Sequence, residues 1–170
     1  GLEPDIMIAG KGMGSGYASI SGTYSTEAIA ESIMNAGYLV MFHTFAALPM
    51  SCAASSAVLK ILRRERLCEK VAPLGEKLKE RLTSRLGQHP LVAEIRGKGL
   101  LVGIEIVKDK EQLMSFDEEE KITEQVVSQG LKEGIFLYPG GTGEYRDIIC
   151  LGPPYIIGDE EIDLMVDGVE

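Results

Sequence analysis

The period of the hydrophobic positions changes at about residue 90, so the two parts of the chain predict different structures. Before that point a short apolar run is followed by glycines, and later apolar residues recur at helical spacing. The elements expected in this part are strands at 5–9 and 18–24, helices at 28–36, 50–66 and 74–86, and a loop at 37–47. Pro73 is expected to kink or interrupt the chain before the last of these helices, because proline cannot donate the helical hydrogen bond.

From Pro90 onward, short runs of β-branched and aliphatic residues predict strands. The elements expected here are strands at 92–95, 100–107, 135–138 and 148–151, a helix at 117–132, and a last helix from 160 that Asp159 caps. This pattern indicates an α+β lobe with a small antiparallel or mixed sheet. The predicted boundary lies at Pro73, which gives two parts, residues 1–72 and 73–170.

Composition narrows the possible partners. The net charge of −9 argues against a nucleic-acid or anionic-membrane partner, and glycine, proline or charge breaks every long apolar stretch. Cys52, Cys68 and Cys150 are odd in number and lack metal-ligand spacing, which favours free thiols in a reduced, cytoplasmic compartment. His43 and His89 lie far apart in the sequence, so a histidine metal site is not expected.

The candidate chemistry begins with Lys11, which lies among Gly10, Gly12, Gly14 and Gly16 directly after the first apolar run. We expect that run to form a buried strand. Burial of a lysine stem favours the neutral amine, which attacks carbonyls to form a Schiff base. The glycines lack Cβ atoms and would let a bulky, flat ligand approach. A solvated loop lysine is the alternative, and composition alone favours it.

Nucleotide-binding motifs fit this glycine-rich segment poorly. A phosphate-binding P-loop has serine or threonine after its lysine, whereas Gly12 follows Lys11. The dinucleotide fingerprint spaces its glycines differently and opens a helix, whereas these glycines alternate and precede a second predicted strand. A strand, lysine loop and strand in succession therefore point away from nucleotide binding.

Four motifs in order along the chain resemble the class III aminotransferases, which are pyridoxal-phosphate enzymes of fold type I. They are Pro4-Asp5-Ile6 with Gly10-Lys11-Gly12-Met13-Gly14-Ser15-Gly16-Tyr17, His43-Thr44-Phe45, Arg96-Gly97-Lys98-Gly99-Leu100 running into Gly103-Ile104-Glu105, and Pro153-Pro154-Tyr155-Ile156-Ile157. Together they span most of the chain and reverse the preference for a solvated Lys11. The resemblance implies an α/β fold: the C-terminal part of the large cofactor domain, residues 1–72 with a connecting helix, then a small α+β domain, 73–170.

The resemblance also implies roles for individual residues. Lys11 would bind pyridoxal 5'-phosphate covalently and move a proton during transfer of an amino group from an amino donor to a keto acid. Thr44 would bind the cofactor phosphate from the partner subunit of a homodimer or larger homo-oligomer; the alternative is a loop threonine bonded to its own backbone. Arg146 would hold a substrate carboxylate, although the family's usual arginine positions carry Gly143 and Cys150 here, so a solvated loop arginine is an equal alternative.

Other activities remain open on the same scaffold. An aminomutase, racemase or decarboxylase would carry the same lysine motif, and a non-catalytic fragment would carry it without turnover. The chain starts almost at once with an interior strand, so the resemblance implies roughly the C-terminal half of a longer enzyme. Arg96, in the turn motif, is expected to form a structural ion pair.

Overall fold

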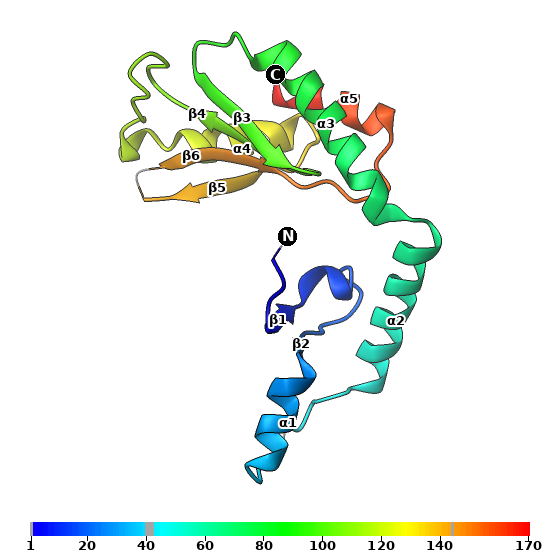
Figure 1. The fold of residues 1–170 in the computed structure, drawn as a ribbon. Coiled ribbons are helices and arrows are strands. Elements are labelled where there is room, and N and C mark those ends of the chain that lie inside the picture. The colour runs from blue at the N-terminus through cyan, green and yellow to red at the C-terminus, as the bar shows by residue number, and fades with distance from the viewer. Residues whose placement is uncertain (1, 40–42, 144) are drawn as a thin grey trace. The chain divides into compact units, whose positions relative to one another are not determined.

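The computed structural model describes residues 2–39, 43–143 and 145–170, which form two compact units, 1–66 and 67–170 (Figure 1). Residues 40–42 of the predicted loop at 37–47 lie outside the described residues. The units meet between Arg66 and Leu67, whereas the sequence placed the boundary at Pro73.

The described residues of the first unit form a two-stranded sheet and two α-helices. Strands β1 (Ile6–Ala9) and β2 (Gly22–Ser25) pair antiparallel, and the 3₁₀ turn η1 (Lys11–Met13) lies between them. Helix α1 (Glu27–Asn35) follows Thr26 as its N-cap, and α2 (Pro49–Arg64) begins with Pro49 in its first turn, where a missing N–H costs nothing. The two predicted helices of this unit are therefore confirmed within one or two residues at each end.

The two predicted strands of this unit differ from the observed ones in burial and extent. The side chains of Ile6, Met7 and Ile8 are 52%, 50% and 79% exposed, so β1 is not the buried strand that its sequence predicts. Burial requires layers on both faces, and a two-stranded sheet supplies few neighbours. The second predicted strand, 18–24, is observed only from Gly22, because the chain first completes the turn around Lys11.

Helix α3 (Leu67–Leu86) opens the second unit and runs through Pro73 without a break, which contradicts the predicted interruption. Pro73 cannot donate a hydrogen bond to the carbonyl of Glu69, one turn earlier. The apolar face of α3 is nevertheless buried through its later turns, at Leu78, Leu82 and Leu86. Packing of this face outweighs one missing hydrogen bond near the helix N-terminus.

The sheet of the second unit is antiparallel, in the order β3-β4-β6-β5 (Figure 1). The strands are β3 (Val92–Lys98), β4 (Leu101–Ile106), β5 (Tyr138–Thr142) and β6 (Tyr145–Leu151). Three of them confirm predicted strands. The predicted strand 135–138 is displaced: β5 begins only at Tyr138, and Ile135 and Leu137 before it are buried outside the sheet, so burial rather than pairing explains their apolar character.

The described part of this unit also contains the 3₁₀ turn η2 (Glu118–Glu120) and the helices α4 (Ile122–Lys132) and α5 (Asp159–Val169). The predicted helix 117–132 is therefore split, at Lys121 with its left-handed φ of 48°. Gly158, rather than the predicted Asp159, is the N-cap of α5. The backbone N–H of Gly158 donates a hydrogen bond to the Glu161 carboxylate at 2.9 Å.

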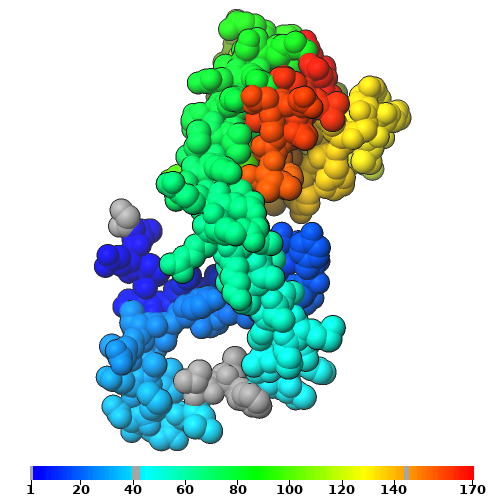
Figure 2. Space-filling view, turned by 90° about the vertical axis from the view of Figure 1, so that its right-hand side faces the viewer, coloured from blue at the N-terminus to red at the C-terminus, as the bar shows by residue number. Residues whose placement is uncertain are grey.

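The core of the second unit joins α3 and α5 to one face of the sheet. Its buried members include Leu82 of α3, Val102 of β4, Ile149 of β6 and Ile162 of α5. Figure 2 shows α3, in green, and α5, in orange to red, side by side on the surface. Within the described residues, no helix is long and apolar enough to cross a membrane.

Candidate functional site

Lys11 lies two residues beyond β1, at the start of η1, in a conformation that favours glycine. Its φ is 45°, in the left-handed region, which costs an ordinary residue about 1–2 kcal/mol. Two backbone hydrogen bonds fix this turn: Met13 N–H donates to Gly10 O at 3.0 Å, and Gly14 N–H donates to Lys11 O at 3.1 Å. Such a conformation occurs at functional sites and also in ordinary turns, as at Ser15, whose φ is likewise 45°.

The loop after Lys11 depends on the absence of a side chain at Gly14. Gly14 is buried, and a Cβ atom there would lie 2.2 Å from the carbonyl oxygen of Ala18, which is a backbone clash. Tyr17 N–H closes the next turn by donating to Gly14 O at 2.8 Å. Glycine at this position therefore allows the loop to fold tightly beside Lys11.

Lys11 borders an open pocket of about 570 Å³, which Tyr17, Ser19 and Ile20 also line. Its volume is within the range of small-molecule sites, roughly 300–1,000 Å³. Cβ atoms at Gly12 or Gly16 would meet no atom within 4 Å, so space is open at these two glycines of the lysine loop. Lys11 itself is exposed, because β1 is uncovered within this unit.

A second pocket, about 630 Å³, brings the segment after the lysine loop to the segment around Thr44. Ser19 and Ile20 line both pockets, while His43 and Phe45 line only the second among the described residues. Thr44 is exposed in a turn that Ala46 N–H closes by donating to His43 O at 2.9 Å. Within the described residues, Thr44 therefore does not share the Lys11 pocket.

Arg146, on β6, is half-buried, and its guanidinium bonds to backbone carbonyls. One terminal nitrogen donates to Gly143 O at 3.3 Å and the other to Phe116 O at 3.2 Å. Its Nε and the Oδ2 atom of neighbouring Asp147 are buried without a partner in the described part of the chain. The other oxygen of Asp147 accepts a hydrogen bond from Thr123 Oγ1 at 3.4 Å. In this structure Arg146 therefore links the turn at Gly143 to the loop at Phe116.

Arg96 forms the structural ion pair that its motif predicts. It bridges Glu105 of the adjacent strand β4 and Glu94 of its own strand, the latter at 2.7 Å. The hydrogen bond to Glu105, followed by that to Glu94, raises the pKa of Arg96. Because both acceptors lie on the same small sheet, these ion pairs stabilise the pairing of β3 with β4. The role of Arg96 in this structure is therefore structural.

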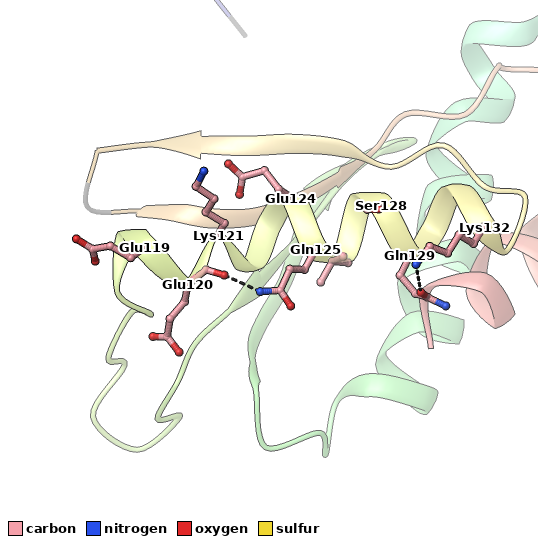
Figure 3. A pocket seen from close by; sticks show the side chains of 9 residues that line it. Glu119, Glu120, Lys121, Glu124, Gln125, Ser128, Gln129 and Lys132 are labelled. Atoms are coloured by element: carbon pink, nitrogen blue, oxygen red, sulfur yellow. Dashed lines mark hydrogen bonds between the residues drawn. The ribbon is translucent and has the colours of Figure 1, made fainter.

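A polar groove of about 760 Å³ runs along η2 and α4 (Figure 3), a feature that no motif in the sequence singled out. Hydrogen bonds within it are local: Gln125 Nε2 donates to Glu120 O at 2.6 Å, and Lys132 Nζ donates to Gln129 Oε1 at 3.4 Å. Glu120 also accepts a hydrogen bond from Lys108, which lies outside the groove, at 3.1 Å, and this bond raises the pKa of Lys108. Among the described residues, no cluster of histidine, cysteine or carboxylate side chains could hold a metal ion.

Solved structures identify the class of enzyme to which this fold belongs. The chain matches a Bacillus anthracis aminotransferase with a TM-score of 0.91 and 35% identity, covering 99% of this chain and 38% of that one. It matches an (S)-enantioselective ω-transaminase from Thermomicrobium roseum with a TM-score of 0.89 and 34% identity, covering 99% and 36% of the two chains. The fold is therefore part of a fold-type-I transferase, with a small α+β domain as its second unit.

The sequence relatives agree. The family model for aminotransferase class III matches residues 1–170, and the chain belongs to that family. An uncharacterized aminotransferase of Schizosaccharomyces pombe is 40% identical over 99% of this chain and 38% of its own length. The taurine–pyruvate aminotransferase of Bilophila wadsworthia is 32% identical, with the same coverage of both chains. The chain thus spans 38% of the length of these curated relatives.

Proposed function

We propose that the complete protein is a pyridoxal-phosphate-dependent aminotransferase, with Lys11 as the residue that binds the cofactor covalently. The observation that carries this proposal is the geometry of Lys11: a lysine with a left-handed φ that follows a strand and borders an open pocket, with free space at Gly12, the next residue. Membership in the class III family supports the same assignment.

The residues around Lys11 fit such a cofactor. The primary amine suits its aldehyde, the open space at Gly12 and Gly16 suits a flat ring, and Ser19 adds a hydroxyl at the pocket wall. When bound, pyridoxal phosphate supplies an aldehyde and an electron-withdrawing ring. Lys11 would anchor the cofactor through Nζ, and the same nitrogen, once released, would carry the proton between the carbon atoms of substrate and cofactor.

We further propose that Thr44 binds the cofactor phosphate of a neighbouring subunit, which makes the complete enzyme a homodimer or a larger homo-oligomer. Its exposure, and its place outside the Lys11 pocket among the described residues, suit a partner in another chain. The first half of α2 adds small side chains, such as Ala53 and Ala57, that are exposed and allow close approach of another helix.

The proposed substrates are an amino donor and a keto-acid acceptor. Arg146 would bind a carboxylate of one of them by exchanging carbonyl partners for carboxylate oxygens. Its present hydrogen bonds, at 3.2 and 3.3 Å, are longer than charge-assisted bonds to a carboxylate, about 2.7–2.9 Å. A carboxylate would therefore be a stronger partner for this guanidinium than either carbonyl.

The test is chemical labelling of the complete enzyme. Borohydride treatment of the cofactor-loaded protein should fix the cofactor on the peptide that contains Lys11. The Lys11→Ala variant should lose both the label and transamination, whereas Lys60→Ala, which alters another exposed lysine of the same unit, should keep both. Label on Lys60 or Lys98 in the wild-type protein would overturn the assignment.

A further inference from the structure

The second unit contains an apolar pocket away from the lysine loop. Its volume is about 340 Å³, at the lower end of the range for small-molecule sites, roughly 300–1,000 Å³. The walls come from α3, the sheet and α4, and include Leu86, Ile104, Ile149 and Val126. Since most of these walls are aliphatic, an occupant that fills the pocket must itself be mainly apolar.

The border of this pocket carries polar groups. Arg85 Nε donates to a Glu170 carboxylate oxygen at 2.6 Å, and a terminal nitrogen of Arg85 donates to Asp167 at 2.7 Å. His89 Nδ1 accepts a hydrogen bond from Leu91 N–H at 3.2 Å, which leaves the ring proton on Nε2 as a donor. Arg85, His89 and Glu170 all line the pocket.

From this arrangement we propose that the pocket binds a small amphipathic monocarboxylate, with its alkyl tail among Leu86, Ile104 and Ile149 and its carboxylate on Arg85. The ligand carboxylate replaces that of Glu170 on the Nε side of the guanidinium. This site is separate from the proposed aminotransferase function and does not depend on it.

Two physical points favour an acid over a neutral lipid. The Glu170 side chain already shows that the Nε edge of Arg85 accepts a carboxylate at hydrogen-bonding distance. The Arg85–Glu170 pair is about half exposed at both side chains, and exposed ion pairs are weak, so an incoming carboxylate displaces Glu170 at little cost. An alcohol of the same chain length fills the same walls but cannot replace the charge.

The experiment is calorimetric titration of the purified protein with decanoate and, separately, with decanol. Decanoate should bind with single-site stoichiometry and roughly two- to fivefold more tightly than decanol, the range expected for an exposed ion pair. Arg85→Gln should remove that preference. Arg63→Gln, an exposed arginine on α2 in the other unit, is the matched control and should leave both affinities unchanged.

The decisive variant is Glu170→Gln, which removes the internal competitor. Decanoate should bind roughly two- to fivefold more tightly to it, the range expected for loss of an exposed ion pair, while decanol binding stays the same. Glu160→Gln, an exposed change of equal charge on α5, should have no effect. Val126→Phe should fill the pocket and abolish binding of both ligands.

Several outcomes would overturn the proposal. They are no decanoate binding by the wild-type protein, equal affinity for decanoate and decanol, or decanoate binding that survives Val126→Phe with its affinity intact. If Val126→Phe does not fold, the two changes at exposed positions, Arg85→Gln and Glu170→Gln, decide. A decanoate affinity that neither change alters would show that the ligand binds elsewhere.

Discussion

Replacement of Gly75 by alanine tests how closely α3 packs on the turn between β3 and β4. A Cβ atom at Gly75 would lie 2.1 Å from the carbonyl oxygen of Gly99 and 2.3 Å from its carbonyl carbon. Ordinary contacts begin near 3.4 Å, so helix and turn must separate by about 1 Å. Both atoms belong to backbone, which cannot rotate away as a side chain would.

Two effects of Gly75→Ala oppose each other, and their magnitudes decide the sign. Helix propensity favours alanine over glycine by about 0.8–1 kcal/mol. Overpacking against a rigid neighbour costs typically 1–3 kcal/mol and occasionally more, and here the clash involves several backbone atoms of Gly99. We therefore expect a net loss of about 1–2 kcal/mol in the free energy of unfolding of the second unit, although propensity alone predicts a gain.

The assay is thermal unfolding followed by far-ultraviolet circular dichroism. A loss of 1 kcal/mol lowers the midpoint of a domain of about 100 residues by roughly 4–8 °C. The control is Gly152→Ala, because a Cβ atom at Gly152 meets no atom within 4 Å; this variant should unfold within about 0.5 kcal/mol of the wild type. A Gly75→Ala protein as stable as the wild type, or more stable, would refute the close packing of α3 on this turn.

Further predictions concern the oligomer, pH and the isolated chain. Mixing inactive Lys11→Ala and Thr44→Ala subunits of the complete enzyme should restore part of the activity, because a heterodimer keeps one intact site; no recovery despite proven subunit exchange would show that Thr44 does not act across the interface. Lys77 lowers the pKa of Asp159 below its ordinary 3.8, so this pair stabilises the fold above about pH 3.8, and the contribution disappears as the pH falls through the lower folded value. The thermal midpoint of wild type and Asp159→Asn should therefore converge at low pH, and an unchanged difference would contradict the pairing. The 170-residue chain alone, with added pyridoxal phosphate, should not transaminate a panel of amino donors faster than the free cofactor does, because Lys11 is exposed; faster turnover would show that the chain completes a site by itself.

Local sequence patterns determined most of the secondary structure and the candidate lysine. Apolar spacing located α1, α2 and the last turns of α3, and β-branched runs located β3, β4 and β6, because these periods arise from the geometry of each element. The sequence predicted a loop at Lys11 between two strands, and the structure contains the 3₁₀ turn η1 there. At Pro73 the proline predicted an interruption, whereas apolar residues at helical spacing continued beyond it. The helix continues because its apolar face packs against residues distant in the sequence, which the local pattern does not show.

Only the tertiary structure decided which residues meet. The sequence shows cationic residues four apart at Lys77, Arg81 and Arg85, and carboxylates at similar spacing later in the chain, but not that α3 and α5 bring them into ion pairs. The contact between Gly75 and Gly99 and the exposure of Lys11 are likewise invisible in local pattern. Such pairings depend on how distant segments pack, whereas periodicity and turn residues report only interactions between near neighbours in the chain.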